Sequence, residues 1–347
     1  MLTSQVLHRM PRFGYSAGLL GVAGVLAIAF SLAAPAAFFS SLNLASIAYA
    51  VPEIALMALA ISVAMTTAGI DLSTVTVANL SALLVLFLSD ALVDAEFPSI
   101  VATLIAVGAA LVVGVVAGAI NGLLVAKVRI APILATLATQ QIFLGLAIAL
   151  TKGKPLYGGT PELDVLGIGT LAGIPFLFWA FLVVVVFVAL LMGRTSFGVR
   201  AVMLGENPVA TDYSGISRVG VTVQTYVLCG VLSSLAGVFM AARTASASAG
   251  YGGSYLMLAI TIAVLGGVNP FGGRVAIPGA AIAAVILQMI SSGLNALGYS
   301  AYIYQIVQGL ILVSVFVVQW EVKHRAERVS RDKGRHGVPR NRVAAFA

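Results

Sequence analysis

The residues of this chain that are capable of chemistry are isolated acids and amides set among long apolar stretches. Glu53 directly follows Pro52 within one such stretch, and Asp71 and Ser73 stand in the segment 68–73, AGIDLS, before the next stretch. An acid inside an apolar stretch is costly in lipid, so it faces a cavity or a polar neighbour, or it is protonated. For Glu53 the sequence leaves substrate contact and a benign interfacial position equally open.

The AGIDLS segment allows two interpretations. In the first, Asp71 or Ser73 caps the next helix at a tight turn by accepting hydrogen bonds from free backbone N–H groups. In the second, a broken helix lines a cavity within the membrane. Asn79 and Asn121 are neutral amides in neighbouring apolar stretches, where amides more often join helices than bind ligands. Together with Glu53, these residues are our candidates for a translocation path.

Motifs for catalysis, nucleotide binding and metal binding are absent from the sequence. The glycine-rich stretch 265–274, LGGVNPFGGR, lacks the lysine of a phosphate-binding P-loop, and no H-E-x-x-H, G-x-S-x-G or C-x-x-C pattern occurs. The three histidines, His8, His324 and His336, lie in the terminal segments, and the single cysteine, Cys229, excludes an internal disulfide. We therefore expect a protein that is not an enzyme, with no catalytic residue, no metal site and no cofactor bound by this chain.

The composition identifies lipid as the solvent of this protein. Apolar residues make up 60% of the chain, charged residues 9%, and the mean hydropathy is +1.07. Soluble domains typically carry about 25% charged residues, and a spanning helix needs about 20 apolar residues. The sequence predicts an all-α, polytopic membrane protein with about ten transmembrane helices, at residues 15–34, 43–67, 73–89, 98–118, 131–150, 173–192, 219–241, 256–268, 275–294 and 299–319.

The distribution of positive charge predicts the orientation. With ten spans and a cytoplasmic N-terminus, all but three of the 19 basic residues face the cytoplasm, as the positive-inside rule requires. The exceptions are Lys152, Lys154 and Arg243. The segment 90–96, with three acids and no base, then lies outside. Both termini are therefore expected in the cytoplasm.

The chain divides into three parts on this basis. Residues 1–14 form a cytoplasmic N-terminal segment, residues 15–319 the transmembrane domain, and residues 320–347 a basic cytoplasmic tail. The first apolar stretch is too long for the core of a cleavable signal peptide, so we interpret it as a retained anchor. The basic tail explains the net charge of +7, and we expect it to contact membrane lipid rather than nucleic acid.

Charged side chains between the apolar stretches are concentrated in one loop, residues 193–218. Asn207 and Pro208 are suited to open a short helix there, and Gly215 is suited to close it. A membrane protein gains nothing in lipid from such a loop, but the loop offers a structured surface on which a soluble partner can push. It is therefore the best indication of function in the residues themselves.

Small residues recur at intervals of four in two of the apolar stretches. Gly114, Gly118 and Gly122 form one such series, and Gly145 and Ala149 form another. Small residues at this spacing let helices approach each other closely in a membrane. We expect packing, rather than ligand binding, at these positions.

The segment 68–73 resembles the GGIDLS signature of the permease subunits of simple-sugar ABC importers. These are the ribose, xylose, arabinose, galactose and autoinducer-2 type, in the branched-chain permease superfamily. Four further stretches agree with that family in order and spacing, and the resemblance covers about residues 40–318. Each motif alone is weak, whereas the ordered set is highly specific. The four are NGLLVAK at 121–127, ILATLAT at 133–139, GENPVATDYSGI at 205–216, and the glycine-rich stretch from 265 to Gly279.

This resemblance implies a type II ABC importer permease fold in the bacterial cytoplasmic (inner) membrane. In that family the stretch at 205–216 is a coupling helix, which docks in a cleft of a separate cytoplasmic ATPase subunit that uses the ATP. A second permease copy or homologue and a periplasmic sugar-binding protein complete the assembly. The coupling residues that the resemblance assigns are Gly205, Glu206, Asn207, Pro208, Ala210, Thr211 and Gly215.

Two departures from the family pattern leave the identity of the sugar open. TVT follows Ser73 at 74–76 where the family continues Val-Gly-Ser, and Glu53 stands where the family mostly has a neutral residue. The implied mechanism is alternating access by a permease dimer. The alternative is an ion-coupled secondary transporter of a small polar solute. Such carriers place ionisable pairs at mid-membrane, but neither Glu53 nor Asp71 has a basic partner nearby in sequence.

Overall fold

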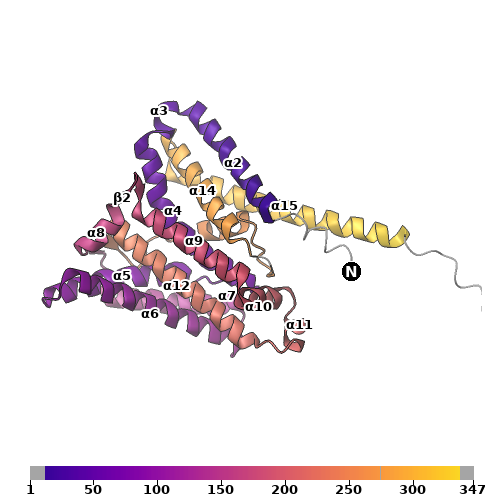
Figure 1. The fold of residues 1–347 in the computed structure, drawn as a ribbon, viewed down its shortest axis with the longest axis horizontal. Coiled ribbons are helices and arrows are strands. Elements are labelled where there is room, and N and C mark those ends of the chain that lie inside the picture. The colour runs from indigo at the N-terminus through magenta and orange to yellow at the C-terminus, as the bar shows by residue number, and fades with distance from the viewer. Residues whose placement is uncertain (1–11, 274, 337–347) are drawn as a thin grey trace, which may run out of the picture.

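The computed structural model describes residues 12–273 and 275–336, and most of the described chain is helical (Figure 1). Most of the predicted N-terminal segment, Arg274 and the last part of the tail lie outside the described residues. The helices are α2 (Arg12–Ala33), α3 (Pro35–Phe38), α4 (Ser41–Thr66), α5 (Thr74–Asp94), α6 (Ser99–Ala126), α7 (Pro132–Thr151), α8 (Pro161–Ile168), α9 (Phe176–Arg194), α10 (Ser196–Glu206), α11 (Pro208–Tyr213), α12 (Arg218–Thr244), α13 (Tyr255–Leu265), α14 (Ile277–Ala296) and α15 (Ala301–His336).

Each of the ten predicted spans coincides with a helix, and within the described residues eight helices are long and apolar enough to cross a membrane. The exceptions are α13, with 11 residues, and the apolar part of α15, Ala301–Val317. A helix of 11 residues is about 17 Å long, which is shorter than the hydrocarbon core of about 30 Å. The prediction of a multi-pass, all-α membrane protein is confirmed, and the count of ten stays a prediction.

The last helix runs through the predicted boundary between span and tail at residue 319. Helix α15 continues without a break to His336, and the boundary of the transmembrane domain stays a prediction. Figure 1 shows this helix projecting well beyond the rest of the bundle. The backbone of the first part of the tail is therefore an extension of the last helix.

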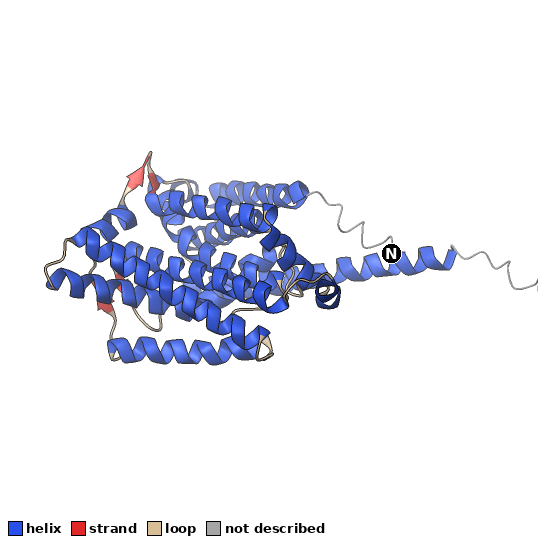
Figure 2. Cartoon of the chain, turned by 60° about the horizontal axis from the view of Figure 1, so that its bottom comes forward, coloured by secondary structure: helices blue, strands red, loops and turns tan. Residues whose placement is uncertain are grey.

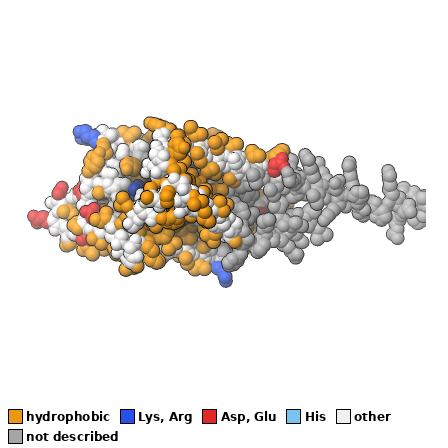
Figure 3. Space-filling model, turned by 90° about the horizontal axis from the view of Figure 1, so that it is seen from above, with side chains coloured by type: hydrophobic (Ala, Val, Ile, Leu, Met, Phe, Trp, Pro, Cys, Tyr) orange, Lys and Arg blue, Asp and Glu red, His pale blue; other side chains and the backbone are white. Residues whose placement is uncertain are grey.

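Helices α4 and α12 form the centre of the bundle. In the most apolar part of each helix, 83% of the residues are buried for α4 and 78% for α12, against 28% for α7 and 22% for α9. The outer helices expose many large apolar side chains, and Figure 3 shows hydrophobic side chains over much of one face. This is the pattern of a protein whose periphery meets lipid, because apolar surface is stable there without burial in protein.

The glycines at intervals of four bring α6 against α12, as the sequence predicts. A Cβ atom on Gly118 would collide with the backbone of Tyr226 and Val227, and one on Gly114 would collide with the carbonyl oxygen of Gly230. Gly145 differs, since a Cβ atom there would meet nothing within 4 Å. Close backbone contact thus explains the first series of small residues but not the second.

Short strands tie together the loops at the end of the bundle away from α10 and α11 (Figure 2). Strand β1 (Leu156–Tyr157) pairs antiparallel with β4 (Ser246–Ala247), which joins the loop after α7 to the loop after α12. Strand β2 (Thr170–Leu171) pairs with β3 (Ile174–Pro175) in a hairpin before α9. The β1–β4 pairing holds the segment that follows α12 against the loop after α7.

Candidate translocation and coupling sites

A hydrogen-bonded network of polar side chains surrounds the break between α4 and α5. The carboxylate of Asp71 accepts bonds from the backbone N–H of Ser73 at 2.9 Å and from its hydroxyl at 2.6 Å. The Asn121 side chain of α6 donates to the Ser73 hydroxyl at 2.8 Å, and its own oxygen accepts from Thr139 of α7 at 2.7 Å. Asp71, Ser73 and Asn121 are almost completely buried. The network therefore joins the break to α6 and α7.

Asp71, rather than Ser73, accepts a backbone hydrogen bond at this position, within the turn that precedes α5. Ser73 occupies the position before the first residue of α5, but its side chain makes no capping bond. Asp71 instead accepts from the backbone two residues further on, which is the bond of an Asx turn. Asn121 also approaches the same carboxylate oxygen, at 3.4 Å. A satisfied carboxylate of this kind stabilises the turn between the two helices.

A second polar cluster lies further along α4. Glu53 is 1% exposed, and its carboxylate accepts two hydrogen bonds from the guanidinium of Arg243 near the end of α12, at 3.0 Å and 2.7 Å. The hydroxyl of Tyr255, the first residue of α13, lies 3.4 Å from the same carboxylate. The side chain of Arg243 is 26% exposed, so this pair is buried on the acid side and partly exposed on the basic side.

Asn79 of α5 lies against the segment that connects α12 to α13. Its side-chain N–H groups donate to the carbonyl oxygens of Ala249 at 3.0 Å and Tyr251 at 2.7 Å. Asn79 is only about 8 Å along α5 from its first residue, so the connecting segment turns back into the bundle to reach it. The Asn79 side-chain oxygen is buried and has no hydrogen-bond partner among the described residues.

The sequence missed the two residues that complete the Glu53 cluster. Arg243 was one of the three basic residues left outside the membrane, and Tyr255 carried no signal of its own. One sequence feature could have indicated the pair: Glu53 and Arg243 are isolated charges of opposite sign, each beside or within an apolar stretch. Because a buried charge needs a partner, such charges are candidates to pair even when 190 residues separate them.

The polar loop 193–218 folds as two short helices. The second, α11, is the short helix that Asn207 and Pro208 were expected to open, and α10 precedes it. Helix α10 ends at Glu206, and α11 begins at Pro208. Asn207 separates them, and its side-chain oxygen caps α11 by accepting from the backbone N–H of Ala210 at 3.0 Å. Gly215 follows α11 with φ +71°, a left-handed conformation that favours glycine. Two helices form because the extended backbone of Asn207 interrupts the helical hydrogen bonding.

The coupling candidates divide into an inner and an outer set. Gly205 is buried against the end of α4, where a Cβ atom would collide with the carbonyl oxygen of Thr66. The same carbonyl accepts from the backbone N–H of Gly273 at 3.0 Å. Thr211 is also buried. The outer set, which is exposed, consists of Glu206, Asn207, Pro208, Ala210 and Gly215.

Exposed apolar side chains accompany the outer set on α11. Val209 is 59% exposed and Tyr213 is 90% exposed. The contact of Gly205 with Thr66 fixes the end of α10, which directly precedes this exposed helix, to the end of α4. The arrangement joins a surface suited to a partner to the central helix of the bundle, which carries Glu53 about 20 Å away along its axis.

Comparison with known proteins identifies the family. The model of the family described as branched-chain amino acid transport system / permease component matches residues 43–316. The ribose import permease protein of Escherichia coli is 36% identical over 286 residues, which cover 81% of this chain and 86% of that protein. The corresponding protein of Bacillus subtilis is 35% identical over 291 residues, covering 83% and 88%.

A second kind of relative also matches. The autoinducer 2 import system permease protein of Yersinia enterocolitica is 32% identical over 278 residues, which cover 80% of this chain and 75% of that protein. No solved structure matches the chain. The resemblance to permease subunits of simple-sugar ABC importers is thus confirmed, and such a subunit is a transport component rather than an enzyme. This chain belongs to the family of permease components of branched-chain amino acid transport systems.

Proposed function

We propose that this chain is the transmembrane permease subunit of an ATP-driven ABC importer that moves a simple sugar or sugar-like solute into the cell. The observation that carries the proposal is the combination of family membership with an exposed α11 that directly follows α10, whose end contacts the central helix α4 at Gly205. The relatives that match over most of their length import ribose or autoinducer 2. Ribose is therefore the first solute to test.

In this proposal a separate cytoplasmic ATPase binds the outer set of coupling residues and uses the ATP. Force on α11 passes through Gly205 to Thr66 and so to α4. Backbone contacts of this closeness transmit displacement well, because they leave no side chain to absorb it. A periplasmic binding protein delivers the sugar from the opposite side, and a second permease copy or homologue completes a type II importer in the bacterial inner membrane.

The proposed path runs beside α4, between the Glu53 cluster and the network at Asp71. Glu53 and Asn79 lie beside the segment that turns back into the bundle, so they are placed to respond when this segment moves. Asp71, Ser73 and Asn121 act at the other end by holding the helix break in shape. Their role is to support the path, since their polar atoms are already engaged with one another.

The topology in this proposal has ten spans with both termini in the cytoplasm. The bond between Gly273 and Thr66 supports it, because it places the loop after α13 at the end of the bundle that carries α10 and α11. Helix α12 begins at that end, and its last turn lies with Glu53 further along α4. The chain therefore returns between residues 244 and 273, although α13 alone is short.

One observation favours the alternative, an ion-coupled carrier. The pair of Glu53 with Arg243 is an ionisable pair inside the bundle, a feature that such carriers use, and the sequence argument against it rested on the absence of a nearby partner. Family membership favours the ATP-driven importer over this alternative. The two functions differ in their energy source, which is directly measurable.

The experiment is uptake of radiolabelled ribose into proteoliposomes that contain the permease, its ATPase and its binding protein, with both soluble components taken from the neighbouring genes. We expect uptake that requires ATP on the cytoplasmic side and the binding protein, and that persists when an ionophore collapses all ion gradients. Uptake that needs an ion gradient and ignores ATP would establish the carrier instead. The empty-vesicle control corrects for passive entry of ribose.

A further inference from the structure

A cavity of about 560 Å³ opens at the end of the bundle that carries α10 and α11. Its volume is within the range of about 300–1,000 Å³ that small-molecule sites occupy. One wall comes from α11 and the start of α12, with Pro208, Asp212 and Thr222. The other wall comes from the α4–α5 break and the turn after α6, with Gly69 and Arg129. Pro208 is the one residue of its lining that also belongs to the outer set of coupling residues.

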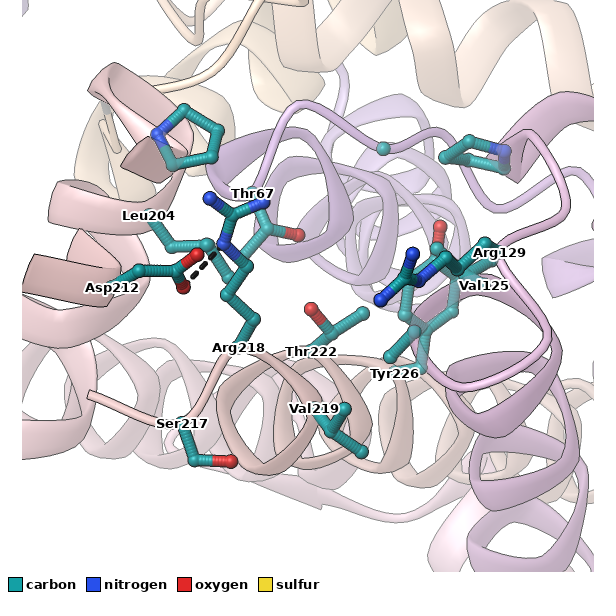
Figure 4. Close-up of a pocket in the computed structure, with 14 residues that line it drawn as sticks. Thr67, Val125, Arg129, Leu204, Asp212, Ser217, Arg218, Val219, Thr222 and Tyr226 are labelled. Atoms are coloured by element: carbon teal, nitrogen blue, oxygen red, sulfur yellow. Dashed lines mark hydrogen bonds and ion pairs between the residues drawn. The ribbon is translucent and has the colours of Figure 1, made fainter. Parts of the chain in front are cut away.

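Positive charge lines both walls of the cavity. Figure 4 shows Arg218 and Arg129 on opposite sides of the space between them. Arg218 forms an ion pair with Asp212, whereas no carboxylate among the described residues forms an ion pair with Arg129. The charged side chains of the cavity therefore sum to one positive charge. Guanidinium groups on two sides of a cavity of this size suit a phosphate group, because each can donate two parallel hydrogen bonds to its oxygens.

Hydroxyl groups supply the rest of the polar lining. Tyr226 is fully buried, and its hydroxyl has no hydrogen-bond partner among the described residues. This hydroxyl lies against Gly69, where a Cβ atom would approach its oxygen to 2.5 Å. A buried polar group without a partner destabilises the protein, and a ligand that supplies the partner removes that cost. Thr222 and Ser217 add two further hydroxyls to the same cavity.

We propose that this cavity binds a phosphate ester of a small polyol. The phosphate lies between Arg129 and Arg218, and the hydroxyls of the polyol bond to Thr222 and Tyr226. Two cellular sources share this chemistry: a free sugar phosphate in the cytoplasm, and the glycerol phosphate headgroup of phosphatidylglycerol at the membrane surface. Either ligand would contact α11 and the α4–α5 break at once, because these segments form opposite walls.

The test is calorimetric titration of the purified full-length permease in detergent and phosphate-free buffer. Ribose phosphate is one probe, and unphosphorylated ribose is the control ligand that lacks its charge. Short-chain phosphatidylglycerol is the other probe, and short-chain phosphatidylcholine is the control ligand for it. We expect at least one phosphate probe to bind saturably. Its control ligand should bind with a dissociation constant that is higher by roughly tenfold or more, since hydrogen bonds to charged groups are strong. The probe that binds identifies the source.

Two variants locate the binding at the cavity. Arg129→Gln and Arg218→Gln each should weaken the phosphate probe by roughly tenfold or more. Lys127→Gln is the matched control, because Lys127 is an exposed cation in the same turn as Arg129 but does not line the cavity. It should bind as the wild type does. The proposal is overturned if neither phosphate probe binds saturably, or if Arg129→Gln and Lys127→Gln bind equally well. The measurement needs no transport, so its failure leaves the proposed import function untouched.

Discussion

Arg243 donates two hydrogen bonds to the carboxylate of Glu53 from 190 residues away in the sequence. The two side chains differ in burial, since Glu53 is 1% exposed and the side chain of Arg243 is 26% exposed. Removal of Arg243 therefore leaves a buried carboxylate without its partner, whereas removal of Glu53 leaves a guanidinium that is partly exposed. Because the two side chains differ in burial, substitutions of Arg243 and of Glu53 should destabilise the protein to different extents.

We predict that Arg243→Gln destabilises the permease by about 3 kcal/mol and that Glu53→Gln destabilises it by less. The double variant should recover most of the loss, because two neutral amides can bond to each other without a stranded charge. Thermal unfolding of the purified variants measures both effects. Tyr255→Phe is the control, with an expected cost under about 1 kcal/mol for one long hydrogen bond. Equal losses in both single variants, without recovery in the double, would contradict the assigned pairing.

The contact between α6 and α12 gives a prediction with an internal control. Gly118→Ala places a Cβ atom against the backbone of Tyr226 and should destabilise the protein by about 2 kcal/mol or more. Gly145→Ala makes the same change in α7, where nothing lies within 4 Å, and should be neutral or slightly stabilising. Unfolding temperatures of the two variants provide the comparison. An unchanged unfolding temperature for Gly118→Ala together with a lowered one for Gly145→Ala would contradict these contacts.

The network at Asp71 predicts a graded response to substitution. Asp71→Asn keeps an oxygen that accepts from the backbone N–H of Ser73, and asparagine caps about as well as aspartate, so this variant should change stability and ribose uptake little. Asp71→Ala removes the acceptor and leaves buried donors unpaired, at a cost of about 1–3 kcal/mol. Expression and uptake in cells check both variants. If Asp71→Asn expresses normally but loses uptake, the charge itself takes part in transport and the capping role is insufficient.

The topology can be tested in the native background, because the single cysteine, Cys229, is fully buried and should not react. With ten spans, cysteines at Asp94 and Ser300 should label from outside the cell, and cysteines at Phe271 and Lys333 only after the membrane is opened. Phe271 is the informative position, since it follows α13 and is 80% exposed. Labelling of Phe271→Cys from outside would mean that α13 does not complete a crossing.

The sequence predicted the elements of the fold well because its signals are local. Apolar stretches of about 20 residues give spans, and the proline after Asn207 gives the start of α11. Glycines at intervals of four predicted that α6 packs closely against another helix. They did not predict that this helix is α12, because the spacing of small residues on one helix carries no information about its partner. The division of the polar loop into two helices depends on the conformation of one residue, Asn207, which propensity does not determine.

The sites were less predictable because their partners are remote in the chain. The residues Asp71, Ser73 and Asn121 were all candidates in the sequence, yet their mutual bonds depend on the packing of α6 and α7 against the break. For the same reason, the sequence did not predict that Glu53 pairs with Arg243 or that Gly205 contacts Thr66. Pairings over such separations are set by the tertiary fold and leave no periodic pattern in the sequence.

We propose that an ATPase drives this permease through the exposed face of α11, and a charge placed on that face should uncouple the two proteins. Ribose uptake and ATP hydrolysis are measured in the same proteoliposomes for the wild type and for Ala210→Arg, which places a bulky charge on the exposed helix without entering the core. For Ala210→Arg we expect normal insertion and a normal unfolding temperature, with loss of ATP-dependent uptake and of the ATP hydrolysis that the binding protein stimulates. Normal uptake and normal stimulated hydrolysis in Ala210→Arg would contradict it.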